Sequence, residues 1–291
     1  PPRMTVTDAH IDSDEQLVNQ LVDELLSEFP PKEVDAVTFL GAQFDKGLAW
    51  VNFPKGHGGL DMNPKLQKIV NERVYKAGAP NSGYRNPIGH GMCGPTVAVW
   101  GSEEQKARYL RPLFTGEEIW CQLFSEPGSG SDFAGLSSKG VKDGDEWIIN
   151  GQKVWTTLAH LSRWGLLVVR TDTEAVKHAG LTAFVVDMHD PTVDVRPLRQ
   201  MTGEAEFNEV FFTDTRIPAK EMLGNPGDGD ADPGMTHGRT TTVALHGAAA
   251  TRALSPATST CDDTSRSRSS ARAPAPRPKK TDSLVVRLTV T

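Results

Sequence analysis

The strongest constraint on this chain is a change of hydrophobic periodicity near Ile119. Before that point, apolar residues recur at the spacing of helices, as they do from Leu17 to Phe29. After it, short runs rich in β-branched and aromatic residues alternate with brief polar turns, which is the pattern of strands. Because no helical segment separates these runs, the second region is predicted to form an antiparallel sheet or barrel.

Capping-box pairs predict two helix starts in the first region. Ser13 is followed by Gln16, and Ser102 by Gln105, each ahead of a helical pattern. Further helices are predicted at residues 32–46, 64–77 and 94–100. His90 lies in a glycine-punctuated turn, where we expect it to pack rather than to catalyse.

The second region contains the predicted strands. They span residues 119–124, 137–142, 147–149, 164–171, 181–187, 193–197 and 209–213. Asp143-Gly144 and Asn150-Gly151 separate apolar segments, and both dipeptides favour the type I′ turn of a tight hairpin. The G-x-G-x-x-G motif of a Rossmann unit is absent, because Phe133 stands at the third glycine position. A nucleotide bound here would need another architecture.

A second break falls before Asp228. All 20 aromatic residues precede it, and residues 228–291 also lack isoleucine and glutamate. Such a tail cannot bury enough apolar surface to offset the entropy of an ordered chain. We therefore predict an α+β chain: an N-terminal helical domain (1–118), an antiparallel β-barrel domain (119–227) and a disordered or aberrant C-terminal tail (228–291).

Charge and cysteine usage exclude several classes of protein. Residues 1–227 are net acidic, and the basic run Arg272–Lys280 lies in the predicted tail, so we expect no nucleic-acid partner. Cys93, Cys121 and Cys261 are too widely spaced to indicate a disulfide framework or a zinc site. This cysteine usage makes a reducing, cytoplasmic location the expected one. No apolar run approaches the roughly 20 residues of a membrane-spanning helix.

Two segments carry the most specific signal. Residues 121–132 read Cys-Gln-Leu-Phe-Ser-Glu-Pro-Gly-Ser-Gly-Ser-Asp, and residues 150–157 read Asn-Gly-Gln-Lys-Val-Trp-Thr-Thr. Together with Gly101–Lys106 and Phe207–Pro218, they resemble the acyl-CoA dehydrogenase family. The resemblance implies FAD as cofactor, acyl-CoA as substrate, an electron-transfer flavoprotein as electron acceptor, and a homo- or hetero-oligomer.

The resemblance also assigns residues to a cofactor site. Those expected to contact the flavin are Gln122, Phe124, Ser125, Trp155, Thr156 and Thr157. The Ser125 hydroxyl would bond to the ring, and Thr157 would approach its hydride-accepting nitrogen. Ser131 would contact the pantetheine-phosphate arm of acyl-CoA. Without the paired segments, Trp155 would be interpreted as a tryptophan of the barrel core.

The resemblance ends near Gly227. The family's catalytic glutamate lies beyond that point, yet no glutamate follows Glu221, so we assign no catalytic base. A shifted reading frame would explain the abrupt change of composition. Three functions stay open: an acyl-CoA dehydrogenase impaired by loss of its C-terminal domain, a catalytically inactive remnant or partner subunit that binds acyl-CoA without oxidation, and a flavin oxidase or monooxygenase of related architecture.

Overall fold

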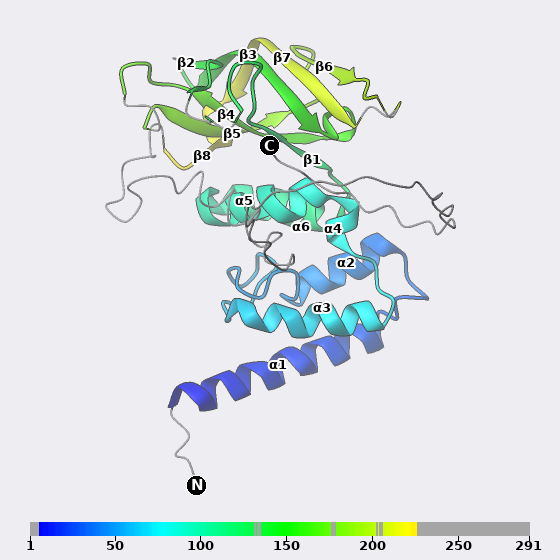
Figure 1. Cartoon of the computed structure of the whole chain (residues 1–291). Coiled ribbons are helices and arrows are strands. Elements are labelled where there is room, and N and C mark those ends of the chain that lie inside the picture. The colour runs from blue at the N-terminus through cyan, green and yellow to red at the C-terminus, as the bar shows by residue number, and fades with distance from the viewer. Residues whose placement is uncertain are drawn as a thin grey trace, which may run out of the picture.

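The computed structural model describes residues 6–225, with the exception of 131, 133–134, 176–178, 202 and 204–205. The predicted tail and Ser131 therefore lie outside the described residues. The helices are α1 (Val6–Glu28), α2 (Ala36–Asp45), α3 (Gln67–Lys76), α4 (Ser82–Arg85), α5 (Gly94–Trp100) and α6 (Glu103–Thr115). They form layers under a single sheet, and α1 lies farthest from that sheet (Figure 1). The predicted order of helices followed by sheet is confirmed.

Helix starts follow the predicted capping at one position and depart from it at another. Ser102 Oγ accepts a hydrogen bond from Gln105 N at 3.2 Å, and Ser102 N donates to Gln105 Oε1 at 2.8 Å, so this capping box is present at the start of α6. The capping box predicted at Ser13 is wrong, because α1 already begins at Val6. No proline or glycine between Val6 and Ser13 interrupts the helix there.

The strands are β1 (Trp120–Leu123), β2 (Lys139–Asp143), β3 (Glu146–Thr157), β4 (Trp164–Arg170), β5 (Leu181–Asp187), β6 (Val193–Leu198), β7 (Phe207–Pro218) and β8 (Met222–Leu223). Their order in the sheet is β6-β7-β3-β2-β4-β5-β8, with β1 beside β4. Most pairs are antiparallel, but β1–β4 is parallel, and so is the single β2–β4 pair. Within the described chain β6 and β8 do not pair, so the sheet is not closed and the predicted barrel is only loosely one.

The two Asx-Gly dipeptides adopt different structures. Asp143-Gly144 forms the β2–β3 hairpin, with Gly144 at a φ of +61°. The turn predicted at Asn150-Gly151 is wrong, because both residues lie inside β3. A Cβ atom at Gly151 would stand 2.2 Å from Ser138 Oγ. This glycine therefore permits two segments of the polypeptide to pass closely, and it does not reverse the direction of the backbone. Asn150 Nδ2 instead donates to Asp214 Oδ1 at 2.9 Å, across to β7.

The central strand β4 is buried on both of its faces, and this joins the layers. Leu166 and Val168 belong to the apolar core that the sheet shares with the helices. Leu167 and Val169 point the other way, into a second core formed within the sheet domain. The alternation follows from the two-residue period of a strand, and burial on both faces explains the continuous apolar run of the sequence.

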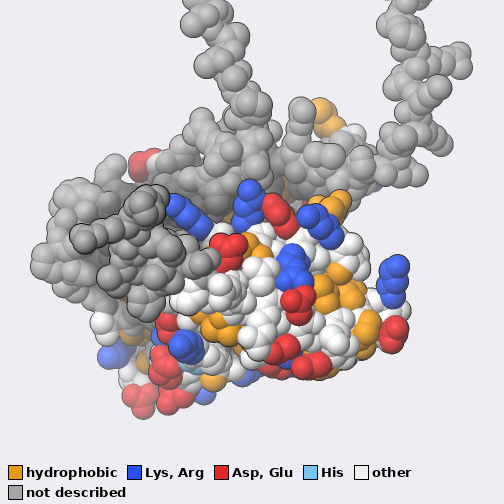
Figure 2. Space-filling model, turned by 90° about the horizontal axis from the view of Figure 1, so that it is seen from below, with side chains coloured by type: hydrophobic (Ala, Val, Ile, Leu, Met, Phe, Trp, Pro, Cys, Tyr) orange, Lys and Arg blue, Asp and Glu red, His pale blue; other side chains and the backbone are white. Residues whose placement is uncertain are grey.

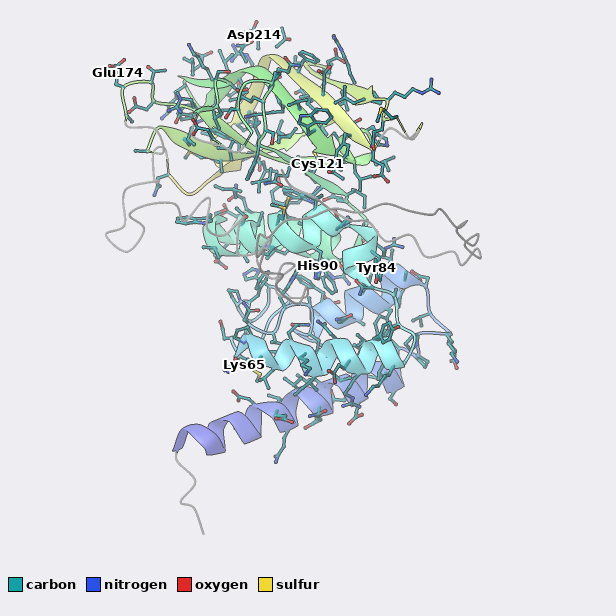
Figure 3. All side chains as sticks on the ribbon, in the orientation of Figure 1. Lys65, Tyr84, His90, Cys121, Glu174 and Asp214 are labelled. Atoms are coloured by element: carbon teal, nitrogen blue, oxygen red, sulfur yellow. The ribbon has the colours of Figure 1, made fainter. Side chains whose placement is uncertain are left out.

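A buried asparagine fixes the first strand to the helices. Asn86 is fully buried; its Nδ2 donates to Leu113 O at 3.0 Å and to Glu118 O at 3.1 Å. Its Oδ1 accepts from Trp120 N at 3.1 Å, at the start of β1. Cys121, the next residue, lies where the sheet meets the α5–α6 layer (Figure 3). The helical layer thus fixes the position at which residues 121–132 begin.

Helix α6 also holds the last described part of the sheet domain, residues 220–222. Gln105 Nε2 donates to Lys220 O at 2.9 Å and to Met222 O at 3.1 Å. Tyr109 Oη donates to Glu221 Oε2 at 2.7 Å. Because α6 contacts both β1 and the residues around β8, it holds the two ends of the sheet domain in one frame.

The surface of the described chain is mixed in charge where it can be seen. Viewed from below, lysine, arginine, aspartate and glutamate side chains lie interspersed, with small apolar areas between them (Figure 2). Among the described helices, none combines the length and the apolar character needed to cross a bilayer. The visible part of this face therefore presents no extended surface of one charge.

Candidate functional site

The first segment is the turn that follows β1. Glu126 N donates to Ser129 O at 2.8 Å, and Ser129 N donates to Glu126 O at 3.0 Å, which closes a tight turn over Pro127 and Gly128. Phe124 packs against the core shared with the helices. Ser125 is partly buried, and its hydroxyl donates no hydrogen bond to any described residue. The turn therefore leaves one small hydroxyl available beside an anchored aromatic ring.

The second segment is the end of β3. The pairing of β3 with β7 shifts register between Lys153 and Thr156, which is the mark of a β-bulge. Within that shift Trp155 has a φ of +60°, an uncommon value for a residue with a side chain, and the residue is 62% exposed. The indole meets Phe207 edge-on, with ring centroids 6.1 Å apart. The bulge thus turns a large aromatic group out of the sheet domain.

The two segments are in direct contact. Val154 N donates to Ser125 O at 2.8 Å, so the residues next to Trp155 and Ser125 itself share a backbone hydrogen bond. Lys153 Nζ donates to Phe124 O at 3.1 Å, and these two residues directly precede Val154 and Ser125 in the sequence. The structure therefore brings together Phe124, Ser125 and Trp155, which are three of the residues predicted to contact the flavin.

A buried ion pair lies beneath this contact. Lys153 Nζ stands 2.8 Å from Glu126 Oε1, and the two side chains are 0% and 3% exposed. Glu126 also accepts hydrogen bonds from Ser137 N at 2.6 Å and from Ser138 N at 3.0 Å. The sequence alone assigns no role to either charged residue. The available signal was the presence of opposite charges in two segments that were expected to meet.

The ionisation of this pair is set by burial and by the partner. Burial alone would raise the pKa of Glu126, but the Lys153 charge, its hydrogen bond and the Ser137 amide outweigh burial and lower this pKa to about 2. Burial lowers the pKa of Lys153, and the Glu126 charge opposes that shift. Each group supplies the counter-charge that the other needs in this buried position.

The remaining predicted residues occupy different depths. Thr156 is 1% exposed, and its Oγ1 has no hydrogen-bond partner in the described chain. Its backbone oxygen accepts from Nδ2 of the fully buried Asn208 at 2.9 Å. Thr157 is partly exposed and pairs with Phe207 of β7, while Gln122 is a partly buried residue of β1. Thr157 is therefore the more accessible of the two threonines, and the predicted flavin contacts of both residues stay predictions.

These groups fit the chemistry of a flavin. An isoalloxazine ring has a flat apolar face and an edge of hydrogen-bond donors and acceptors, so it matches an exposed indole together with small hydroxyls. The hydroxyls of Ser125 and Thr157 donate no hydrogen bond to any described residue. In the same part of the chain, no group of three or more His, Cys, Asp or Glu side chains is arranged to hold a metal ion. An organic cofactor suits the site.

Comparison with known proteins identifies the two layers. Residues 15–117 match the acyl-CoA dehydrogenase N-terminal domain, and residues 121–215 match the acyl-CoA dehydrogenase middle domain. Acyl-CoA dehydrogenase IpdE1 of Mycobacterium tuberculosis is 43% identical over 183 residues, which are 63% of this chain and 47% of that protein. Acyl-CoA dehydrogenase FadE34 of the same organism is 47% identical over 185 residues, which are 64% of this chain and 26% of that protein.

A solved structure supports the same assignment. The Tcur3481-Tcur3483 steroid ACAD shares 27% sequence identity and a TM-score of 0.53, over 74% of this chain and 57% of its own. This chain spans about half the length of IpdE1 and about a quarter of that of FadE34. The chain belongs to the acyl-CoA dehydrogenase family, of which it carries the N-terminal and middle domains.

Proposed function

We propose that this chain binds FAD and an acyl-CoA thioester and serves the α,β-dehydrogenation of that thioester, with electrons passed to an electron-transfer flavoprotein. One observation carries the proposal: the backbone hydrogen bond from Val154 to Ser125 joins the two segments that carry the predicted flavin contacts. Family membership supports the same reaction type. In the cell we expect a cytoplasmic homo- or hetero-oligomer, as in the family.

The reaction needs two acceptors. A base must take the proton from the α carbon, and a second group must take the hydride from the β carbon. No amino-acid side chain accepts hydride, and FAD supplies that acceptor when it is bound. The task of the described residues is to hold the ring at a fixed place and to keep one of its faces covered.

We infer the following roles at the ring. Trp155 offers its exposed indole as a wall against the flat face. The hydroxyls of Ser125 and Thr157, which donate no hydrogen bond to described residues, would meet polar atoms of the ring edge. Gln122 lies in β1 and Phe124 directly follows that strand, and both would line the edge of the ring. Thr156 would support β3 from its buried side.

A second function has an observation in its favour. Residues 222–291 contain no glutamate, and we assign no catalytic base among them. A chain that binds FAD and acyl-CoA without such a base would leave the α proton in place, because proton removal and hydride transfer are both required. The alternative is therefore a non-oxidising subunit that binds the same ligands.

Titration with FAD followed by anaerobic mixing with acyl-CoA thioesters separates these functions. The thioesters should include short, branched and steroid-type acyl groups, since one related structure is described as a steroid ACAD. Bleaching of the bound flavin supports the dehydrogenase, and bound flavin that no thioester bleaches supports the non-oxidising subunit. Release of peroxide in air would indicate an oxidase.

Matched variants localise the binding. Thr157→Val removes one hydroxyl at the site and should weaken FAD binding about three- to tenfold, the usual effect of losing a hydrogen bond. Thr213→Val makes the same change at an exposed position of β7 and should leave FAD binding unchanged. A chain that binds no FAD at saturating concentrations, or that loses affinity equally in both variants, would refute the proposed site.

A further inference from the structure

The buried ion pair contacts both segments of the site at once. Lys153 belongs to the second segment and Glu126 to the first, and they are 27 positions apart in the chain. The Lys153 ammonium also bonds to Phe124 O at 3.1 Å, two residues before Glu126. Ser125 therefore lies between two contacts of a single ammonium group, and its backbone is held from both sides.

The neighbouring backbone bond completes this arrangement. Val154, which follows Lys153, donates to Ser125 O at 2.8 Å. Three bonds thus join two short pieces of chain, residues 124–126 and 153–154. Trp155 comes next, at the left-handed φ of +60°. Because this conformation is unfavourable for a residue with a side chain, it persists only where the surrounding contacts enforce it.

Stability alone does not explain such a pair. Desolvation of two buried charges roughly cancels their attraction, and apolar replacements of similar size are often as stable. An exposed pair elsewhere in the chain, Lys68 with Glu72, joins two residues of the same helix and constrains no second segment. The buried pair differs in its geometric effect. Its short charge-assisted hydrogen bond joins two segments and fixes their positions relative to each other.

We propose that Lys153 and Glu126 are positioning residues that hold Ser125 and Trp155 in one fixed arrangement, while neither touches the ligand. The link to a flavin rests on the function proposed above. The geometric claim concerns this chain alone, and it concerns the contact between residues 124–126 and residues 153–154.

Hydrogen exchange of the full chain, measured without added ligand, tests the claim directly. The reporter is the Val154 amide, which is protected by its bond to Ser125 O. In Lys153→Met this amide should exchange about tenfold faster or more, because opening of the contact no longer has to break the ion pair. The Leu110 amide, inside α6, reports the stability of the helical layer.

A double variant keeps the test valid if the single one folds poorly. Lys153→Met combined with Glu126→Gln removes both charges and strands no buried ion. We expect the Val154 amide to exchange about tenfold faster in this variant too, while the Leu110 amide keeps its rate. The control Lys68→Met, at an exposed pair, should change neither amide.

Two results would overturn the proposal. One is a double variant in which the Val154 amide is as protected as in the starting chain. The other is an equal acceleration of the Val154 and Leu110 amides in the double variant, which would mean that the pair supports only global stability.

An FAD titration of the same proteins separates this inference from the proposed function. If the starting chain binds no FAD while the Val154 amide responds as expected, the proposed function fails and the positioning role stands. If the starting chain binds FAD and the double variant binds it as well as the starting chain with unchanged exchange at Val154, the positioning role fails and the function stands.

Discussion

The helical layer and the sheet layer satisfy their polar groups in different ways. In the helical layer, several polar contacts stay within one helix, as in the capping box of Ser102 and Gln105 or the exposed pair of Lys68 and Glu72, and its long-range contacts are hydrogen bonds such as the one from Gln105 Nε2 to Lys220 O. At the site in the sheet, an ion pair is fully buried, while a tryptophan is exposed. This inverts the usual distribution of charge and apolar surface.

This inverted distribution of charged and apolar side chains indicates a place where the residues are not chosen for stability alone. A buried charge pair and a residue at a positive φ each cost free energy that a simpler arrangement would save. Both occur at the one place where the two segments of the family meet. The helical layer is therefore the frame, and the end of β3 with the turn after β1 is the surface that the frame supports.

The largest effect is expected from stranding the buried charge. Lys153→Met should lower the free energy of unfolding by about 3–5 kcal/mol, because Glu126 then stays buried without its counter-charge. The double variant with Glu126→Gln should recover much of this loss. Chemical denaturation followed by circular dichroism measures both. Equal stability of the single and the double variant would show that Glu126 does not depend on Lys153.

The helical layer has a titrating group of its own. His90 lies among the helices (Figure 3), and burial lowers its pKa to about 4. Its ring stacks on Trp50 at 5.2 Å, and Nδ1 lies 3.2 Å from Ser82 Oγ. Because the unfolded chain binds the proton more tightly, stability should fall as pH drops below about 6.5, by about 2 kcal/mol at pH 5.

His90→Gln removes this titration and should flatten the fall between pH 7.5 and pH 5, as measured by urea denaturation. The folded chain lowers the pKa of Glu126 from 4.5 to about 2. This carboxyl therefore stabilises the fold fully at pH values above 4.5, and that stabilisation is lost as the pH falls from 4.5 towards 2. The two groups therefore act in separate ranges. A variant whose stability still falls by about 2 kcal/mol over this range would exclude His90 as the cause.

A smaller effect is expected at the start of α6. Ser102→Ala removes the side-chain acceptor of Gln105 N and should cost about 1 kcal/mol of stability. Ser102→Thr keeps the acceptor and serves as the control. Thermal denaturation of the two variants measures the difference. A cost well above this value would show that the helical layer also depends on a non-local polar contact at this point.

The smallest change in stability is expected at the exposed tryptophan. Trp155→Gly relieves the positive φ but loses the contact with Phe207, and these effects are each about 1 kcal/mol and opposite in sign. Stability should therefore stay nearly constant, while FAD affinity falls about tenfold with loss of the aromatic wall. Tyr75→Ala, at an exposed aromatic residue of α3, should change neither. A Trp155→Gly protein with unaltered FAD affinity would remove Trp155 from the site.

Much of the helical layer follows from the sequence, and less of the site does. The pattern around Ser102 predicts the start of α6 because a capping box needs only residues three positions apart. Asn150-Gly151 misleads, since the same dipeptide suits a hairpin turn and the close passage of Ser138 over Gly151. Nothing local distinguishes these two uses, because the deciding atom belongs to another part of the chain.

The order of helices and strands, the family, and the two segments that carry its signature all follow from the amino-acid sequence. These depend on periodicity, caps and short motifs, which are local properties of the chain. Only the tertiary structure decided that the sheet stays open in the described chain, that Trp155 turns outward at a bulge, and that Lys153 meets Glu126. The reason is that strand register and a buried ion pair depend on which distant segments approach each other, and that is settled when the two layers pack.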